Sequence, residues 1–498
     1  MPLNYASWEQ VSGWRFLFHR LSVAVGRRTV RLIHDPSKNN SAALLVSGVI
    51  AFLIVGLSFV MGFFSPAGQI GDSRLLADRA SGGLYVEVDG MLHPALNLAS
   101  ARLIVGQADN PKLVTANAIR KYPIGPTVGI VGAPNDLAVR APATSGWALC
   151  DRLGSAGSRV TPKVTVISGL PEPGDWASEL TSPRAALMSY GSEVYVVTDG
   201  HRSQIDLADR AVMLALGLPG GDLHPSAMSR ALYEALAPTP PLRVPVVPAA
   251  GQPLWYASEQ LPVVSGSVVQ VADASGDPQF FLALPAGVQM VSQTVATMIR
   301  NANIAGGTRE ISVPGHVVAA VPQVKGFDLS MYPPGRLQLV DKTSEPVTCV
   351  AWRKGAGEAR ARLGVITGRR LPIPVAAETR LVRLVNAGPD VADEVYVGAD
   401  SANFVQVTGV DPASTRGESL WLVSDNGVRF GVVTGGKDEG ENLRALGLDR
   451  KPVPAPWAVV HWLPAGPALS KAAALTEHDT LAPDPSPAPL IMKKAGKN

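Results

Sequence analysis

The feature that most constrains this chain is an uncharged, apolar stretch over residues 41–64, SAALLVSGVIAFLIVGLSFVMGFF. A helix of these 24 residues is about 36 Å long, enough to cross a hydrocarbon core of about 30 Å. A helix buried in a soluble domain rarely runs this far without a charged residue. No later stretch of the sequence compares with it. We therefore expect a single transmembrane helix over residues 41–64.

The charges that flank this stretch predict its orientation. Residues 1–40 carry six cations: Arg15, Arg20, Arg27, Arg28, Arg31 and Lys38. Residues 65–80 carry two arginines, which two aspartates offset. Because positive residues flanking a span tend to stay in the cytoplasm, we expect a cytoplasmic N-terminus and an exported, periplasmic C-terminal region. The apolar run and the segment before it are too long for a cleaved signal peptide, which favours an uncleaved anchor.

The predicted cytoplasmic segment, residues 1–40, carries an amphipathic pattern. Trp14, Leu17, Phe18 and Leu21 recur at helical spacing, with arginines beside them. One interpretation is a helix that lies on anionic lipid. The other is a helix that docks on a cytoplasmic or membrane partner. These residues alone leave both interpretations open.

More than 400 residues follow the predicted span, and they contain both cysteines of the chain, Cys150 and Cys349. Two lone cysteines in an oxidising compartment usually pair, so we predict a disulfide; the alternative is two buried free thiols. The regions around both cysteines contain apolar, strand-like runs. We interpret them as one central β-rich domain, built discontinuously from residues 146–185 and 310–400.

A similar pattern occurs four times in the exported region. Each copy is an apolar strand that ends in a Gly-containing turn and is followed by a second strand and a helical stretch. The first strands with their turns lie at residues 84–90 (LYVEVDG), 194–200 (VYVVTDG), 280–287 (FFLALPAG) and 420–427 (LWLVSDNG). Asp-Gly and Asn-Gly favour tight hairpin turns. The irregular spacing excludes a solenoid, so we expect four separate ββα-type repeats around the central domain.

These patterns predict an elongated α+β region with a definite order of parts. Its expected segments are repeat 1 (70–145), central domain (146–185), repeat 2 (186–237), a Pro-rich connection (238–262), repeat 3 (263–309), central domain (310–400), repeat 4 (401–468) and a disordered tail (469–498). The tail is rich in Ala, Pro and Lys and has no periodicity.

Local signals predict the ends of two helices. Asp206 and Asp438 each precede a helical stretch as N-cap candidates. The Leu-Gly-Leu sequences at 216–218 and 446–448 predict helix ends with a glycine in the left-handed conformation.

No catalytic motif stands out. The chain contains no P-loop, no H-E-x-x-H and no G-x-S-x-G sequence, and its eight histidines are scattered singly. We therefore predict no metal site and leave the catalytic residues unknown. The weak candidate for holding a phosphate is Lys437, in the loop TGGKDE, but Asp438 and Glu439 place negative charge beside it. A net charge of +3 argues against a general nucleic-acid binder.

Longer strings resemble a known family. Residues 10–20 (QVSGWRFLFHR), 27–36 (RRTVRLIHDP), 84–104 (LYVEVDGMLHPALNLASARLI) and 464–469 (PAGPAL), together with the cysteine pair, are similar to EccB, a membrane component of the type VII (ESX) secretion system of mycobacteria and other actinobacteria. The resemblance covers essentially residues 5–475.

The resemblance implies a structural membrane subunit whose periplasmic part, four repeats around a central domain, helps to form the translocon. It implies the partners EccC, EccD and EccE, contact with inner-membrane lipid and self-association in the periplasm. Some family members are described as periplasmic ATPases, and the repeats have been likened to a cell-wall-binding module. ATP hydrolysis and peptidoglycan binding are therefore alternatives, but the sequence has no P-loop. We favour the structural role, without a cofactor and with Trp14, Leu17, Phe18 and Leu21 facing a partner.

Overall fold

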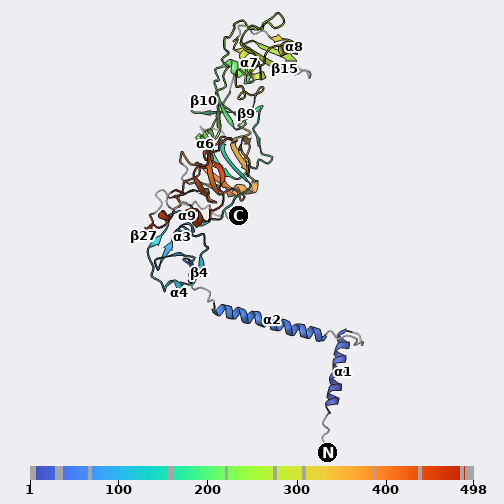
Figure 1. Cartoon of the computed structure of the whole chain (residues 1–498), viewed down its shortest axis with the longest axis vertical. Helices are drawn as coiled ribbons and strands as arrows, with labels where there is room; N and C mark the ends of the chain where they lie inside the picture. The colour runs from blue at the N-terminus through green and yellow to red at the C-terminus, as the bar shows by residue number, and fades with distance from the viewer. Residues whose placement is uncertain are drawn as a thin grey trace, which may run out of the picture.

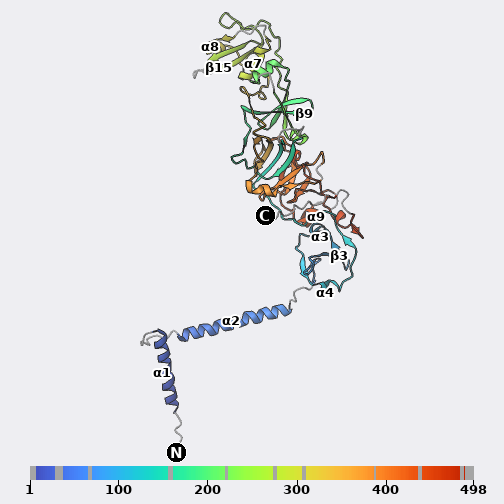
Figure 2. The same cartoon turned by 180° about the vertical axis from the view of Figure 1, so that it is seen from behind.

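The chain forms two separate helices followed by an elongated body of mixed α and β structure (Figures 1 and 2). Helix α1 spans Trp8–Arg27 and helix α2 spans Ser37–Phe64. The computed structural model describes residues 7–27, 37–64, 70–154, 161–218, 223–272, 278–304, 310–385, 388–435, 440–482 and 487.

Helix α2 contains the stretch for which the sequence predicts a membrane span. In the described part of the chain, no helix is both long enough and apolar enough to be identified as a membrane span. The single span over residues 41–64 therefore stays a prediction.

In the part of the chain that the structure describes, four of the five sheets share one strand order, in which the third, second, first and fourth strands are neighbours. In each, three consecutive strands form an antiparallel meander: β1 (Leu75–Asp78), β2 (Leu84–Val88) and β3 (Met91–Ala95); β9 (Arg184–Tyr190), β10 (Glu193–Thr198) and β11 (His201–Ile205); β14 (Val268–Ala272), β15 (Pro278–Leu284) and β16 (Gly287–Val291); β23 (Phe404–Thr408), β24 (Leu420–Val423) and β25 (Arg429–Val432). We call the four sheets, with the helices that follow each meander, units 1 to 4.

A helix follows each meander, and the chain then returns to pair in parallel with the first strand. The helices are α3 (Leu98–Val105), α5 (Arg210–Ala215), α7 (Gln293–Asn301) and α9 (Glu441–Leu446). The parallel fourth strands are β4 (Lys112–Val114), β12 (Ser226–Ala227), β17 (Ile311–Ser312) and β26 (Val453–Pro456). A second short helix comes next in each unit: α4 (Ala116–Ile119), α6 (Arg230–Ala235), α8 (Gly315–Ala319) and α10 (Trp457–Val460).

The common topology agrees with the four patterns in the sequence, while the repeat bounds themselves stay a prediction. One boundary differs from our expectation. Strand β17 and helix α8 fall within residues 310–400, which we expected to belong to the central domain, but β17 pairs with β14 of unit 3. The parallel strand has only two residues, Ile311–Ser312, so it leaves no pattern that the sequence could reveal.

The hairpin turns form where the sequence predicts them. Asp89 and Asp199 have φ angles of 51° and 50°, and the glycine that follows each also has a positive φ. At the second turn the glycine is required for space as well, because a Cβ on Gly200 would lie 2.9 Å from Cγ of Leu363. This turn packs directly on a strand of the fifth sheet.

Both Leu-Gly-Leu sequences end helices as predicted. Gly217 and Gly447 have φ angles of 73° and 74°. The N–H of Leu218 donates to the Met213 carbonyl at 2.9 Å, and the N–H of Leu448 makes the equivalent bond at 2.8 Å. Together with the left-handed glycines, these bonds form Schellman motifs.

The N-cap of α5 differs from the prediction. Asp209, not Asp206, accepts hydrogen bonds from the N–H groups of Ala211 and Val212. Asp206 instead accepts from the N–H of Ala208, so it fixes the turn that precedes the helix. Both aspartates precede the same apolar run, and only the exact start of the helix distinguishes them.

The fifth sheet is the central one and has seven strands. Their order is β21 (Val382–Arg383), β22 (Glu394–Val397), β7 (Lys163–Ser168), β6 (Thr144–Arg152), β19 (Val347–Gly355), β20 (Arg362–Gly368) and β8 (Ala177–Glu179). Two sequence regions nearly 200 residues apart therefore interleave in one sheet.

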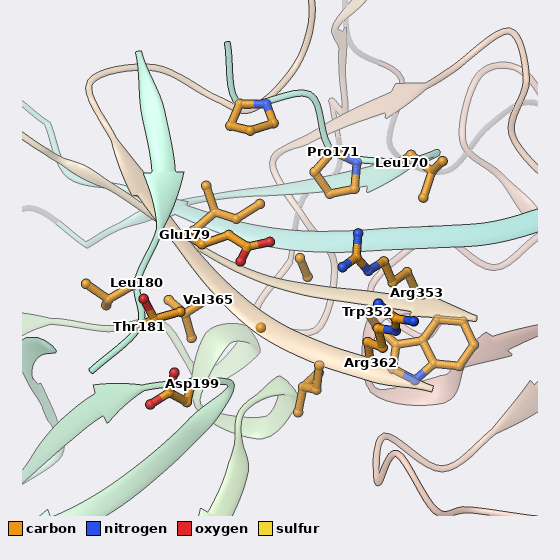
Figure 3. A pocket seen from close by; sticks show the side chains of 15 residues that line it. Leu170, Pro171, Glu179, Leu180, Thr181, Asp199, Trp352, Arg353, Arg362 and Val365 are labelled. Atoms are coloured by element: carbon orange, nitrogen blue, oxygen red, sulfur yellow. The ribbon is translucent and has the colours of Figure 1, made fainter. Parts of the chain in front are cut away.

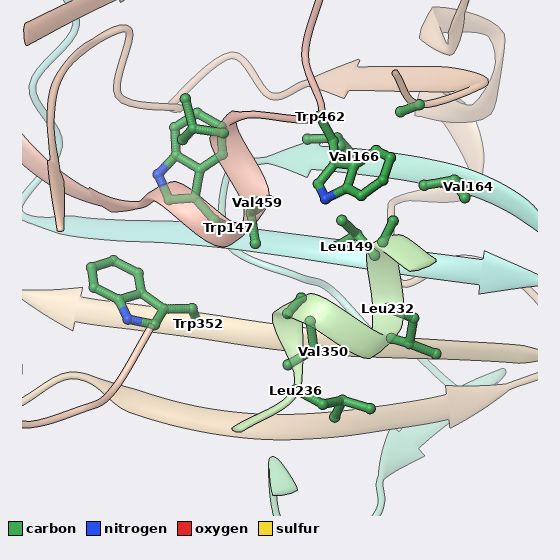
Figure 4. Packing of buried hydrophobic residues seen from close by; sticks show 14 of the residues in the cluster. Trp147, Leu149, Val164, Val166, Leu232, Leu236, Val350, Trp352, Val459 and Trp462 are labelled. Carbon is green, nitrogen blue, oxygen red and sulfur yellow. The ribbon is translucent and has the colours of Figure 1, made fainter. Parts of the chain in front are cut away.

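The hydrophobic core joins the central sheet to two of the units. Trp147 of β6 and Trp352 of β19 are fully buried and lie in one cluster with Leu232 of α6 and Val459 of α10 (Figure 4). Helix α6 belongs to unit 2 and helix α10 to unit 4. The central sheet and these two units therefore share one core and do not form independent domains.

The expected disordered tail is partly wrong. Helix α11 (Lys471–Ala474) and strand β27 (Glu477–His478) lie within residues 469–498, and β27 pairs with β5 (Thr127–Val128) of unit 1. Leu469 and Ala474 are completely buried. The physical reason is tertiary packing, because the short helix and the two-residue strand are stabilised by contact with unit 1. Such packing leaves no periodic signal in the sequence.

Candidate functional site

Helix α1 presents the apolar face that the sequence predicts. Its first turn is closed by a reciprocal pair, in which Ser7 Oγ accepts from the N–H of Gln10 and Gln10 Oε1 accepts from the N–H of Ser7. The rings of Trp14 and Phe18 stack with centroids 5.5 Å apart. Their exposed fractions are 64% and 65%, so this face is preorganised and uncovered.

Leu17 and Leu21 lie on the same face and are also exposed. The structure therefore brings the four predicted docking residues together on one side of α1. An uncovered cluster of large apolar side chains is typical of a surface that binds lipid or another protein.

The two cysteines form a disulfide, as predicted. Cys150 on β6 and Cys349 on β19 are direct cross-strand partners, and both are completely buried. They lie in an apolar cluster on the face of the central sheet opposite to the two tryptophans. The disulfide is therefore a buried structural cross-link and is not accessible for redox chemistry.

Next to the disulfide, a buried carboxylate ties unit 2 to the central sheet. Asp151 of β6 accepts hydrogen bonds from the N–H and the Oγ of Ser229, each at 2.6 Å. Ser229 is the N-cap of α6, and its Oγ accepts from the N–H of Leu232. Burial raises the pKa of Asp151 to about 7, although the bonds from Ser229 and the charge of Lys342 oppose the rise.

Lys342 is a half-buried cation whose charge interacts with Asp151. Its Nζ donates to the hydroxyl groups of Thr348 and Thr367 at 2.5 and 3.0 Å. Burial lowers the pKa of Lys342 to about 8, while Glu345 and Asp151 act in the opposite direction. Sequence reasoning missed Asp151, Ser229 and Lys342, because they are far apart in the chain and belong to no motif.

A cavity of about 510 Å³ lies between strand β20 and the turn of the β10–β11 hairpin. Figure 3 shows Glu179 on one side of the cavity and Arg353 and Arg362 on the other, while Leu170 and Pro171 contribute apolar wall. With Asp199 also at its edge, two carboxylates face two guanidinium groups. The charges balance, so the cavity does not select a ligand of one sign.

The described residues contain no group of three or more His, Cys, Asp or Glu side chains that could hold a metal ion. The weak phosphate candidate, Lys437, and its neighbour Asp438 lie outside the described residues. The described residues show an uncovered helix face and an elongated body that one disulfide cross-links.

Comparison with known proteins gives consistent matches over nearly the whole chain. The family described as "Type VII secretion system ESX-1, transport TM domain B" (T7SS_ESX1_EccB) matches residues 3–483. The chain is 42% identical over 498 residues to the ESX-5 secretion system ATPase EccB5 of Mycobacterium tuberculosis (strain ATCC 25618 / H37Rv), covering 99% of this chain and 97% of that protein. It is 43% identical over 488 residues to the ESX-2 secretion system ATPase EccB2 of the same organism, covering 97% of each.

Solved structures match as well. A chain of the intact ESX-5 inner membrane complex is similar with a TM-score of 0.77 and 40% identity, covering 99% of both chains. A chain of the EccB3 dimer from the ESX-3 core complex has a TM-score of 0.72 and 35% identity, covering 81% of this chain and 100% of that one.

Proposed function

Since this chain belongs to the EccB family of type VII secretion systems, we propose that it is a structural membrane subunit of an ESX secretion complex. In this proposal α2 anchors the chain in the inner membrane and the elongated body forms part of the translocon on the periplasmic side. The observation that carries the proposal is the similarity, in sequence and fold and over nearly the full length, to a chain of an intact ESX inner membrane complex.

The properties of α2 support the anchor. Residues 41–64 carry no charge. The side chains of Leu44, Phe52 and Val55 are exposed and have no protein packed over them. The hydrocarbon core of a bilayer is the environment that would accommodate such an apolar surface.

The topology of the anchor is directly testable. A reporter enzyme that is active only in the cytoplasm should be silent when fused after residue 80 and active when fused to the N-terminus, because the cations precede the span. The measurement is reporter activity in intact cells, with immunoblots to show equal amounts of both fusions. Activity of the fusion after residue 80 would contradict the proposed orientation.

The exposed face of α1 supports docking on a partner within the complex. Replacing Trp14 and Phe18 together by Ala should reduce recovery of the complex about 30-fold or more, because truncation of central aromatic anchors typically costs about 2 kcal/mol or more. The measurement is co-purification of EccC, EccD and EccE with the tagged chain from membranes.

A matched control is available on the same helix. Trp8 and Phe16 are exposed aromatic residues of the same two types, but they lie off the face formed by Trp14 and Phe18. The Trp8→Ala, Phe16→Ala variant should assemble normally. Equal assembly of both double variants, or equal release of both from the membrane, would favour lipid binding over docking.

We propose EccC, EccD and EccE as partners from family membership, together with self-association in the periplasm. The solved EccB3 dimer supports self-association of a related chain. Several relatives are named ATPases. We do not extend that activity to this chain, because its sequence has no P-loop, and no observation on the described residues favours peptidoglycan binding.

A further inference from the structure

A second cavity, of about 580 Å³, lies where the central sheet meets unit 4. The central sheet contributes Ala143, which directly precedes β6, and Gly355 at the end of β19. Unit 4 contributes β26, whose Pro454 carbonyl accepts a hydrogen bond from Ser145 Oγ at 2.7 Å. The cavity is therefore built on a joint that is fixed by hydrogen bonds.

Three cations from three separate segments line this cavity. Lys354 comes from β19, Arg416 from the connection between β23 and β24, and Lys451 from the segment before β26. None of the three side chains makes an ion pair or a hydrogen bond with any described residue. Elsewhere in the body, cations such as Arg152 and Arg184 pair with glutamates.

The acid among the lining residues does not neutralise these cations. Glu358 accepts a hydrogen bond from the N–H of Gly355 at 2.9 Å and pairs with Arg362 at 3.3 Å. The Gly355 bond, with the charges of Arg362 and Arg353, holds the pKa of Glu358 below its ordinary value. Glu358 is therefore ionised and already committed to other partners, which leaves the cavity with an excess of positive charge.

The connection that carries Arg416 adds neutral donors. Ser414 Oγ accepts from the N–H of Gly409 and from the hydroxyl of Thr408, which fixes the start of this segment. The next three N–H groups, those of residues 415–417, donate to no described residue. Backbone N–H groups beside lysine and arginine are the donor set that anionic oxygens require.

We propose that this cavity binds a small free anion of the phosphate class that carries at least two negative charges. Its volume lies within the range of about 300–1,000 Å³ that is typical of small-ligand sites. The first cavity lacks this excess of positive charge, because two carboxylates line it together with two arginines. Unit 1 lies between α2 and the central sheet (Figure 1), so we assign a free anion and not the headgroup of a membrane lipid.

The test is calorimetric titration of the full-length chain in detergent with sodium pyrophosphate at constant ionic strength. We expect one saturable site, and we expect Arg416→Ala and Lys451→Ala each to weaken binding about tenfold or more. Both side chains are exposed, so their removal should leave the fold intact, which circular dichroism checks.

Arg360→Ala is the matched control, because Arg360 is an exposed cation in the adjacent segment that does not line the cavity. It should bind pyrophosphate like the unaltered chain. If all three variants bound pyrophosphate equally weakly, the loss of affinity would be due to the overall charge of the chain, and the proposal would be overturned. Absence of saturable binding up to millimolar pyrophosphate would overturn it as well, and citrate binding as tightly as pyrophosphate would contradict the phosphate class.

Discussion

Replacing both Cys150 and Cys349 by Ser is expected to lower the free energy of unfolding of the central sheet by about 5 kcal/mol. The disulfide closes a loop with a sequence separation of 199 residues. Without the disulfide, the unfolded chain regains the conformational freedom of that loop. The folded state gains no compensating stabilisation. The substituted hydroxyl groups would also be buried among apolar side chains without assured partners.

The measurement is chemical denaturation followed by hydrogen exchange, with and without a reductant. Reduction should lower the stability of the unaltered chain by about 5 kcal/mol, while the double variant should not respond to the reductant. The loss should spread to α6 and α10, which share the core of the central sheet, and should spare unit 3, most of whose apolar residues form two clusters of their own. A stability that is independent of reductant would refute the structural role of the bond.

Local features of this fold are predictable from the sequence because they depend on a few neighbouring residues. The turn at Asp199 and Gly200 requires positive φ at both positions, and the sequence contains the residues that tolerate it. The helix end at Gly217 and the apolar face of α1 follow from equally local rules. The cysteine pairing was predictable for a different reason, since two cysteines allow one intramolecular pair.

Features that depend on tertiary packing were not predictable. The fourth strand of unit 2, Ser226–Ala227, has two residues and exists because β9 offers an edge for parallel pairing. Helix α11 and strand β27 are stabilised by unit 1, more than 300 residues earlier in the chain. The shared core of the central sheet, α6 and α10 leaves no signal in any one segment.

The same limit applies to the sites. Asp151 and Ser229 are separated by 78 residues, and the sequence around neither indicates a partner. The cavity cations Lys354, Arg416 and Lys451 lie on segments that only the fold brings together. The apolar face of α1 was predictable because all four of its residues lie on one helix.

The contribution of Asp151 to stability is expected to fall by about 3 kcal/mol as the pH rises from about 4 to about 7. The folded pKa is about 7, whereas an unfolded aspartate has a pKa of about 3.9. The folded state therefore binds this proton more tightly than the unfolded state. The resulting stabilisation is complete below the unfolded pKa and is lost as the pH rises through the folded one.

The pH window isolates this residue from its charged neighbour. Lys342 has a folded pKa of about 8, below that of an unfolded lysine, so its contribution is lost as the pH falls towards 8 and is constant between pH 4 and 7. The measurement is the free energy of unfolding of the unaltered chain minus that of Asp151→Asn, taken at several pH values. Subtraction removes the titration of the other carboxylates that both proteins share.

Asp72→Asn, which removes an exposed carboxylate, is the control for the loss of a carboxyl group. A difference between the unaltered chain and Asp151→Asn that stays constant from pH 4 to 7 would show that the hydrogen bonds from Ser229 outweigh burial and keep the folded pKa near its ordinary value. The decrease that we expect follows from the opposite balance. Asp151 is 1% exposed, so the desolvation of its charge is nearly complete, while two hydrogen bonds and one cation replace only part of its hydration. The contact between unit 2 and the central sheet should accordingly be most stable when the carboxyl group of Asp151 is protonated.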